Sequence, residues 1–319
     1  MHAVFLDYKT VDANDLDLGS IEALLPEIVV YAFSNEEEVL ARIEDAEVAI
    51  ANKVVFDANV FARATKLKLI CVTATGTNNI DLEAAKQSGV VVCNIRDYCT
   101  ESVVQHVLLS ILTLMHSFKD YSASIESGDW QDGKSFSLLQ HPITELSGKS
   151  LGIIGYGVLG QGVARAAEAL GLKILVGESF TKSNKSDEGV DRVAFDALLT
   201  ESDIISLHCP LTEDTTELFD ESAFEKMKSS AILINTARGW LVDESALLKG
   251  LKNGKPGVAA FDVLAQEPPE NFELISHDHF LISPHIGGST EESIWAMGIA
   301  AIEGLDMARE ASTFSPYSA

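Results

Sequence analysis

Three polar residues in the second half of the chain carry side chains suited to chemistry on a small organic acid. Arg238 follows the apolar run Ile232–Ala237, Glu267 lies shortly after another apolar run, and His285 follows Ser283-Pro284. A guanidinium group can bind a carboxylate through two parallel hydrogen bonds. An imidazole can transfer a proton, and a carboxylate beside it can orient the ring. Each residue alone also fits a surface ion pair or a structural histidine, so the hypothesis depends on their meeting at one site.

A glycine-rich motif supplies the second chemical signal. Gly155, Gly157 and Gly160 form a G-x-G-x-x-G pattern around Val158 and Leu159, after the strand-like run 151–154 and before a helix expected over 161–170. In that context the glycines allow a tight turn and a close approach to a pyrophosphate, which binds at the helix N-terminus. The motif therefore predicts a dinucleotide site, and the polar residues then suit the proton that accompanies hydride transfer.

An acidic residue indicates which dinucleotide is bound. Glu178 lies 18 residues after Gly160, at the end of the next expected strand, where a carboxylate hydrogen-bonds the adenosine ribose. The same charge repels the 2′-phosphate of NADP, while Ser179 and Lys182 could offset part of that repulsion. We therefore expect NAD rather than NADP as the cofactor.

Composition excludes several other classes of protein. The 319 residues are 46% hydrophobic and 22% charged, with a formal net charge of −25, as in an ordinary globular protein too long for one core. Such an acidic surface disfavours nucleic acids and anionic membranes as partners. The apolar run 103–115 is interrupted by polar residues and too short for a transmembrane helix, and no signal peptide is apparent at the N-terminus.

The cysteines predict a cytoplasmic protein. Cys71, Cys93, Cys99 and Cys209 form no C-x-x-C pair, and no histidine lies at a zinc-finger spacing from them. We expect reduced thiols, a cytoplasmic location and no metal site.

Short apolar runs alternate with helical patterns along the chain and indicate an α/β protein with parallel sheets. The strands are expected at 3–6, 28–33, 48–51, 69–72, 90–93, 151–154, 173–176, 204–207, 231–235, 258–261 and 280–282. Because ligands bind at the carboxyl ends of such strands, Arg238, Glu267 and His285 are candidates for one crevice.

A long apolar helix separates the two β-α series. It is expected to begin with Thr100 as its N-cap and to end near Met115. Its apolar residues exceed one stripe, so it should be buried between domains or subunits. Polar residues 117–146 are interpreted as a connecting arm, and residues 290–311 as a final helix.

Taken in order, these motifs resemble the D-isomer-specific 2-hydroxyacid dehydrogenases over nearly the whole chain. The similar segments are Ala74–Asp81, Gly155–Gly160, Asn235–Gly239, Ala260–Pro268 and Ser283–Gly287. Within that family, the chain is most similar to the glycerate dehydrogenase/hydroxypyruvate reductase branch, in Asn52–Val54, Ala74–Glu101 and Trp130–Leu146.

The resemblance implies roles for individual residues. Arg238 would orient the substrate and polarise its carbonyl group, His285 would be the acid/base, and Glu267 would be the partner of His285. Backbone N–H groups of Thr75 and Gly76 would bind the substrate carboxylate, with Lys53 nearby. The residues implied for the NAD site are Thr100, Gly155, Gly157, Val158, Leu159, Gly160, Glu178, Pro210, Thr236, Ala237, Arg238, Asp262 and Gly288.

The resemblance also implies two doubly wound parallel-sheet domains and a homodimer. A flavodoxin-like substrate-binding domain would comprise residues 1–98 and 290–319, and a Rossmann NAD-binding domain residues 99–289. The implied reaction is reduction of hydroxypyruvate or glyoxylate to D-glycerate or glycolate.

Other functions stay open at this point. The segment Gly287–Thr290 is closer to phosphoglycerate dehydrogenases, although Lys53 has no arginine beside it to hold a phosphate. A broad-specificity 2-keto acid reductase is a second enzyme hypothesis. An NAD-sensing interaction protein of the same fold is a third, because fold alone does not fix function.

Overall fold

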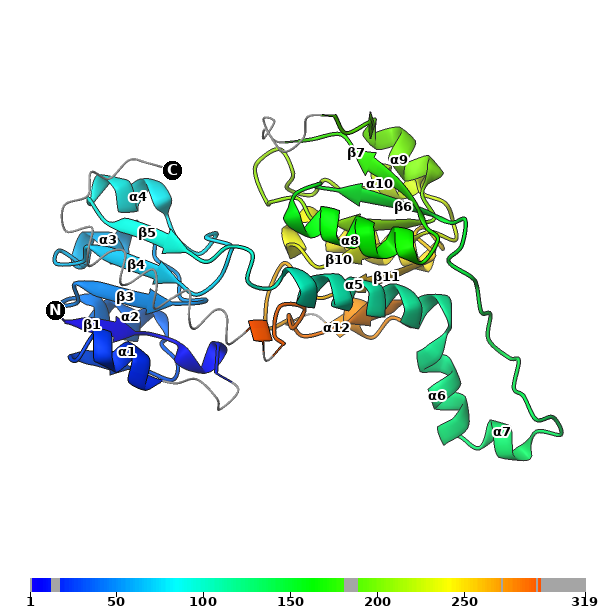
Figure 1. The fold of residues 1–319 in the computed structure, drawn as a ribbon, viewed down its shortest axis with the longest axis horizontal. Coiled ribbons are helices and arrows are strands. Elements are labelled where there is room, and N and C mark those ends of the chain that lie inside the picture. The colour runs from blue at the N-terminus through cyan, green and yellow to red at the C-terminus, as the bar shows by residue number, and fades with distance from the viewer. Residues whose placement is uncertain (1, 13–17, 181–188, 271, 291, 294–319) are drawn as a thin grey trace. The chain divides into compact units, whose positions relative to one another are not determined.

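The chain divides into two compact units, each of which has its own sheet (Figure 1). The computed structural model describes residues 2–12, 18–180, 189–270, 272–290 and 292–293. Unit 1 comprises Met1–Tyr98 with Ser289–Ala319, and unit 2 comprises Cys99–Gly288. Lys182, with the rest of its loop, and nearly all of the helix expected over 290–311 lie outside the described residues.

Unit 1 contains a five-stranded parallel sheet with the order β2-β1-β3-β4-β5. This order reverses direction between β1 and β3, and such a switch point is where doubly wound sheets bind ligands. The strands are β1 (Ala3–Phe5), β2 (Ile28–Val30), β3 (Val48–Ala51), β4 (Leu69–Val72) and β5 (Val91–Asn94).

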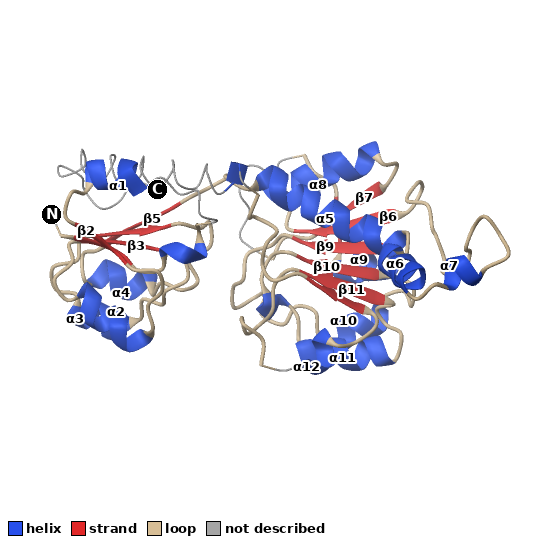
Figure 2. Cartoon of the chain, turned by 90° about the horizontal axis from the view of Figure 1, so that it is seen from below, coloured by secondary structure: helices blue, strands red, loops and turns tan. Residues whose placement is uncertain are grey.

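Helices cover both faces of this sheet, as Figure 2 shows, with α1 on one face and α2, α3 and α4 on the other. The central strands β3 and β4 are therefore buried at every residue. The helical segments are η1 (Tyr8–Thr10), α1 (Leu18–Leu24), α2 (Glu36–Ile43), α3 (Ala58–Arg63) and α4 (Leu82–Gln87).

Unit 2 contains a seven-stranded parallel sheet with the order β12-β11-β10-β9-β6-β7-β8. Its switch point lies between β6 and β9, as in dinucleotide-binding folds. The strands are β6 (Ser150–Ile154), β7 (Lys173–Gly177), β8 (Arg192–Val193), β9 (Ile204–Leu207), β10 (Ile232–Asn235), β11 (Val258–Phe261) and β12 (Phe280–Ile282).

Two hydrophobic layers enclose this second sheet. Helices α5 and α8 pack on one face, and α10, α11 and α12 lie on the other (Figure 2). The helical segments are α5 (Thr100–Met115), α6 (Phe118–Glu126), α7 (Asp129–Asp132), α8 (Val158–Ala169), α9 (Phe195–Glu201), α10 (Glu221–Lys226), η3 (Gly239–Leu241), α11 (Glu244–Lys252) and α12 (Phe272–Ile275).

Several expected boundaries differ from the structure. Thr100 is not the N-cap of α5, since Cys99 occupies that position and Thr100 is the first helical residue. Helix α8 begins at Val158 rather than Gln161, because the last part of the glycine motif already forms the first helical turn. Strand β2 ends at Val30 because the chain then turns towards Asn35, the N-cap of α2.

Two further differences concern segments that carry little apolar pattern. The two-residue strand β8 was not expected, because so short a segment has no periodicity. The expected connecting arm over 117–146 contains the helices α6 and α7.

Helix α5 has one buried face and one exposed face in the single chain. Val104, Val107 and Ile111 are buried against the sheet and α8, whereas Leu109 is 61% exposed. The exposed leucine explains why the sequence has more apolar residues than one stripe requires.

No helix within the described residues has the length and hydrophobicity needed to cross a bilayer. All four cysteines are free thiols.

Candidate active site

Sheet topology brings three of the expected residues to one edge of unit 2. Strands β10, β11 and β12 are adjacent and parallel. Arg238 follows β10, Glu267 follows β11, and His285 follows β12. Since the carboxyl ends of parallel strands lie at the same edge, these residues emerge from neighbouring positions.

A buried asparagine fixes the turn that presents Arg238. The side-chain amide of Asn235 donates to the carbonyl of Arg238 at 2.8 Å, and its Oδ1 accepts from the Ala237 N–H at 3.0 Å. Arg238 Nη1 itself donates to the Ala237 carbonyl at 2.6 Å. The turn is thus held at both ends, which limits how far the guanidinium group can move.

Gly239 packs this turn directly against the loop that follows β11. A Cβ atom at Gly239 would lie 1.9 Å from the carbonyl carbon of Leu264, so only glycine fits there. The backbone N–H of Leu264 in turn donates to Glu267 Oε1 at 2.9 Å. The Arg238 turn and the Glu267 loop are therefore in contact.

Glu267 and His285 form a direct pair. Glu267 Oε2 and His285 Nδ1 lie 2.6 Å apart, and about a third of each side chain is exposed. Because a carboxylate only accepts hydrogen bonds, Nδ1 carries a hydrogen and Nε2 is the ring nitrogen that can exchange a proton with another molecule. The pair thus has the arrangement that an acid/base histidine needs.

Asp262 lies beneath this pair, at the end of β11. Its side chain is 3% exposed. The carboxylate accepts hydrogen bonds from the backbone N–H groups of Ile286 and Gly287, at 2.9 and 2.7 Å. The loop that carries His285 is therefore bound to β11 through Asp262.

The glycine turn after β6 has the geometry of a dinucleotide site. Gly155 has a φ of +91°, and a Cβ atom there would lie 2.4 Å from the Cys209 nitrogen. A Cβ atom at Gly160 would lie 2.1 Å from the Gly155 carbonyl oxygen. By contrast, a Cβ atom at Gly157 would meet nothing within 4 Å, and Gly157 provides no side-chain cap for α8. The helix N-terminus therefore keeps backbone N–H groups and open space for a phosphate.

Other expected cofactor residues surround this turn or follow neighbouring strands. Val158 begins α8 and is 52% exposed, and Leu159 is half-buried beside it. Pro210 is exposed after β9, and Gly288 is half-buried after β12. Thr100 lies on α5 beside α8, since its Cγ2 would be 3.5 Å from a Cβ atom at Gly162.

Thr236 and Glu178 bear on whether NAD fits. Thr236 Oγ1 is buried and has no hydrogen-bond partner in the described chain, so it can accept or donate to a bound molecule. Glu178 is exposed after β7, and its Oε1 accepts from the Phe195 N–H at 2.7 Å. That contact fixes one carboxylate oxygen of Glu178 near the end of β7, the strand after which such folds carry a ribose-binding acid. Together with the glycine turn, these residues fit an NAD molecule.

A partly buried histidine lies beside the glycine turn. His208 follows β9, and its Nε2 lies 2.8 Å from Ser206 Oγ. Burial lowers the pKa of His208 to about 4, because the charged imidazolium is poorly solvated there.

The expected substrate residues of unit 1 lie at the carboxyl ends of β3 and β4. Lys53 is exposed directly after β3, and Thr75 and Gly76 follow β4. The carbonyl oxygen of Thr75 accepts from the Asn94 side chain at 2.7 Å. Unit 1 thus groups Lys53, Thr75 and Gly76 along one sheet edge.

A buried carboxylate shapes the Lys53 loop. Asp7 follows β1 and accepts from the N–H groups of Asn52, Lys53 and Val54 at 2.9, 2.7 and 3.2 Å. Burial raises the pKa of the Asp7 carboxyl group, and these hydrogen bonds partly offset that increase. The loop lies at the switch point of the first sheet, where ligands bind in such folds.

Asp7 and Asn235 were not identified from the sequence as site residues. Each follows or ends a short apolar strand, which is the signal that could have found them. Ser283 was seen only as part of a motif, and His106 only as an interruption of an apolar run.

Comparison with known proteins agrees with this geometry. Residues 108–287 match the NAD-binding domain of the D-isomer specific 2-hydroxyacid dehydrogenases. A glycerate dehydrogenase from Methylorubrum extorquens is 40% identical over 95% of this chain and 94% of its own length. A hydroxypyruvate reductase from Blautia hydrogenotrophica is 34% identical over 96% of both chains.

Solved structures give the same relationship. The crystal structure of a D-lactate dehydrogenase from Aquifex aeolicus, in complex with NAD and lactic acid, superposes with a TM-score of 0.85. It is 25% identical, over 98% of this chain and 96% of that one.

The chain therefore belongs to the D-isomer-specific 2-hydroxyacid dehydrogenase family. It is an NAD-dependent oxidoreductase that acts on 2-hydroxy acids, and the prediction of two parallel-sheet α/β domains is confirmed.

Proposed function

We propose that this enzyme reduces hydroxypyruvate and glyoxylate, with His285 as the acid/base, Glu267 as its partner and Arg238 as the substrate clamp. The observation that carries these roles is the 2.6 Å pair between Glu267 and His285. Their loops follow β11 and β12, and β11 lies beside β10, the strand that precedes Arg238. The substrate proposal is supported by relatives named glycerate dehydrogenase and hydroxypyruvate reductase, which match nearly the whole chain.

In the proposed reaction, NAD supplies the site with a hydride acceptor or, when reduced, a hydride donor. Arg238 binds the substrate carboxylate and polarises the carbonyl oxygen through its planar pair of donors. His285 delivers a proton from Nε2 to that oxygen during reduction and removes it during oxidation. Glu267 keeps the imidazole ring aligned through Nδ1.

We assign binding of NAD to the glycine turn of Gly155, Gly157 and Gly160, with Glu178 at the ribose and Thr236 at a polar group of the cofactor. The turn leaves space for the pyrophosphate at the start of α8. The remaining proposed cofactor contacts are in the first turns of α5 and α8 or follow strands of the same unit. They are Thr100, Val158, Leu159, Pro210, Ala237, Asp262 and Gly288.

Part of the binding of the substrate carboxylate is assigned to unit 1. The N–H groups of Thr75 and Gly76 are proposed as donors, and Lys53 as a nearby cation. These residues lie along one edge of the first sheet, and a highly acidic chain needs such a local site to hold an acid.

We also propose that the protein is a cytoplasmic homodimer. Exposed apolar side chains are concentrated on α5, α6, α7 and the segment that follows them, as expected of a surface that another copy covers. They are Leu109, Leu112, Phe118, Ile125, Trp130, Phe136, Leu139 and Ile143. Figure 1 shows α6 and α7 extending away from the second sheet, as an arm suited to contact a second chain. Four free thiols are consistent with the cytoplasm.

A panel of 2-keto acids tests the proposed function. NADH oxidation is followed with hydroxypyruvate, glyoxylate, pyruvate and phosphohydroxypyruvate at matched concentrations. The expected result is the highest kcat/KM with hydroxypyruvate or glyoxylate. Similar values for pyruvate would support a broad-specificity reductase instead, and no turnover with any 2-keto acid would reject the proposal.

A further inference from the structure

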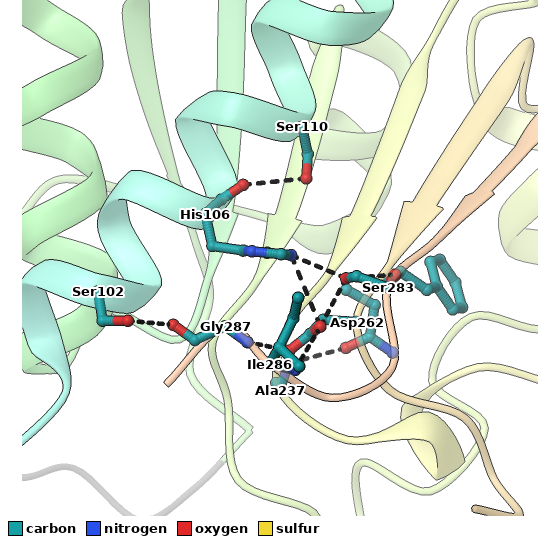
Figure 3. Close-up of polar contacts among 10 residues, drawn as sticks. Ser102, His106, Ser110, Ala237, Asp262, Ser283, Ile286 and Gly287 are labelled. Atoms are coloured by element: carbon teal, nitrogen blue, oxygen red, sulfur yellow. Dashed lines mark hydrogen bonds and ion pairs between the residues drawn. The ribbon is translucent and has the colours of Figure 1, made fainter. Parts of the chain in front are cut away.

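Helix α5 carries a polar stripe on the side that faces residues 283–287, the loop that contains His285. Ser102, His106 and Ser110 are spaced four residues apart and therefore share one face of the helix. Ser102 Oγ donates to the Gly287 carbonyl at 2.7 Å, and His106 Nε2 lies 2.9 Å from Ser283 Oγ (Figure 3). Ser110 bonds only back to its own helix, at the His106 carbonyl. Two members of the stripe thus reach the loop that contains His285.

The hydrogen bonds in this network have a definite direction. Ser283 Oγ lies 2.5 Å from Asp262 Oδ1, and a carboxylate can only accept. The serine hydrogen is therefore donated to Asp262. Because a hydroxyl group has one hydrogen, His106 Nε2 must donate to Ser283, so this nitrogen carries a hydrogen. The chain of donors runs from His106 through Ser283 to Asp262.

Asp262 completes the connection to the residues beside His285. It accepts from the N–H groups of Ile286 and Gly287, as described above, while Ser283 lies two residues before the histidine. Figure 3 shows the ring of His106, on α5, pointing towards Ser283 and Asp262. The loop is therefore fixed both before and after His285.

His285 needs such support because of its backbone conformation. Its φ is +55°, in the left-handed region that a residue other than glycine rarely adopts. A residue held in such a conformation is strained, and the conformation persists only where the surrounding structure holds it. The bonds on either side of His285 contribute to holding it, together with the Glu267 carboxylate at Nδ1 and the Ser283 carbonyl, which accepts from the His285 N–H at 3.0 Å.

Gly287 indicates that the network is closely packed. A Cβ atom at this position would lie 2.9 Å from Asp262 Oδ2 and 3.5 Å from His106 Cγ. A larger residue would therefore displace the Asp262 carboxylate, whereas it would meet the His106 ring at an ordinary contact distance.

We propose that His106 is a positioning residue for the reaction: through Ser283 and Asp262, it holds the loop that aims the imidazole of His285. This inference rests on the acid/base role proposed for His285. In the working enzyme, His106 touches neither the substrate nor the transferred proton, and its effect is on the orientation of His285.

The test compares His106→Leu, which removes the donor, with His106→Gln, which keeps an N–H donor at a similar distance. His106→Leu should lower kcat by about 10- to 100-fold, since a misplacement of about 1 Å costs up to ~100-fold. KM for the keto acid and the Kd of NADH should change little. His106→Gln should restore most of kcat, and His116→Leu, a matched control near the end of the same helix, should leave kcat unchanged.

A second variant guards against poor folding of His106→Leu. Ser283→Ala removes only the hydroxyl group that connects His106 to Asp262, and it should reproduce the loss of kcat with a Tm close to that of the wild type. Unchanged kcat in either correctly folded variant would overturn the inference. So would a loss confined to NADH affinity, because the network would then serve the cofactor.

The proposed function fails in a different way. If the wild type reduces no 2-keto acid, or if His285→Gln keeps full turnover, the role of His285 is wrong whatever His106 does. If His285→Gln is inactive and His106→Leu is not impaired, only the positioning role is rejected.

Discussion

At the scale of single residues, the site separates groups that are proposed to act on the substrate from groups that hold them in place. Glu267 accepts from His285 with one carboxylate oxygen and from the Leu264 N–H with the other. Asn235 does the same for the turn of Arg238, using both ends of its amide. Each proposed catalytic side chain therefore has its own fixed support, which limits the reorganisation needed when substrate binds.

The role of His285 leads to a direct prediction. His285→Gln should lower kcat by at least about 100-fold, because a general acid/base contributes a factor of about 100 to 10,000. The Kd of NADH, measured by fluorescence titration, should stay near the wild-type value, since the substitution leaves the glycine turn intact. Near-normal turnover would remove His285 from the mechanism. His279→Gln, at an exposed histidine of the same unit, is the matched control.

Glu178 carries the prediction on cofactor choice. Glu178→Ala should raise KM for NADH and increase the relative use of NADPH, because both a ribose acceptor and a repulsive charge are lost. Steady-state kinetics with NADH and NADPH measure the ratio of the two kcat/KM values. Glu225→Ala, at an exposed residue of α10, serves as the control. A wild type that already prefers NADPH would contradict this role of Glu178.

At the scale of helices and strands, the sequence predicted the elements with strong patterns and missed the short ones. The strands at 48–51, 69–72, 204–207, 258–261 and 280–282 have the expected bounds, because each is a short apolar run. Strand β8 has two residues and no such run, so only its pairing with β7 defines it. The N-cap of α5 was wrong because Cys99, rather than Thr100, has the non-helical backbone there.

The sequence likewise predicted the site residues that follow apolar strands and missed those that depend on long-range contacts. Arg238, Glu267 and His285 follow apolar strands, which a sequence shows directly. The contacts of His106 and Ser102 join residues 177 and 185 positions apart, at Ser283 and Gly287. No local pattern encodes such a distance, although the spacing of Ser102, His106 and Ser110 could have indicated a buried polar face on α5.

The Lys53 loop gives a prediction at this scale. Asp7→Ala leaves the N–H groups of Asn52, Lys53 and Val54 without their acceptor, so the loop should relax. We expect KM for the keto acid to rise roughly tenfold, which corresponds to about 1.4 kcal/mol of lost binding. The Kd of NADH should not change. Asp45→Ala, which removes an exposed pair with Lys66, is the control, and an unchanged KM in Asp7→Ala would refute the role.

At the scale of the whole molecule, helix α5 has two faces with different environments. One face of α5 contacts the catalytic loop through Ser102 and His106, and the other presents Leu109 and Leu112 to solvent. A second chain that covers the apolar face would therefore rest on the helix that holds the loop of His285. The proposed dimer and the proposed positioning device thus share one element.

Acidic substitutions in the segment that follows α7 test the proposed dimer. The double variant Phe136→Asp/Leu139→Asp places two carboxylates at side chains that are 93% and 82% exposed in the single chain. Since these residues do not pack inside one chain, the fold should persist while association weakens. Light scattering after size exclusion should show the mass of one chain instead of two. Phe33→Asp, at an exposed residue of unit 1, should not change the wild-type mass.

The stability of the whole fold at acidic pH depends on His208. Partial burial lowers the pKa of His208 to about 4, whereas an exposed histidine titrates near 6.5. Between these values the unfolded chain binds a proton that the folded chain does not, so the free energy of unfolding decreases as pH falls from about 6.5 to about 4. The contribution of His208 to the free energy of unfolding is therefore fully present above pH ~6.5. By pH ~4 the free energy of unfolding should have decreased by about 3 kcal/mol.

The measurement is urea unfolding at several pH values for the wild type and for His208→Gln, which cannot titrate but can keep a hydrogen bond to Ser206. Carboxylates titrate in both proteins, so their contribution cancels in the difference between the two curves. The wild type should lose more stability than the variant on acidification, with the difference developing below pH ~6.5. Parallel curves would show that His208 has the same pKa in the folded and unfolded states, so that its surroundings do not lower its pKa.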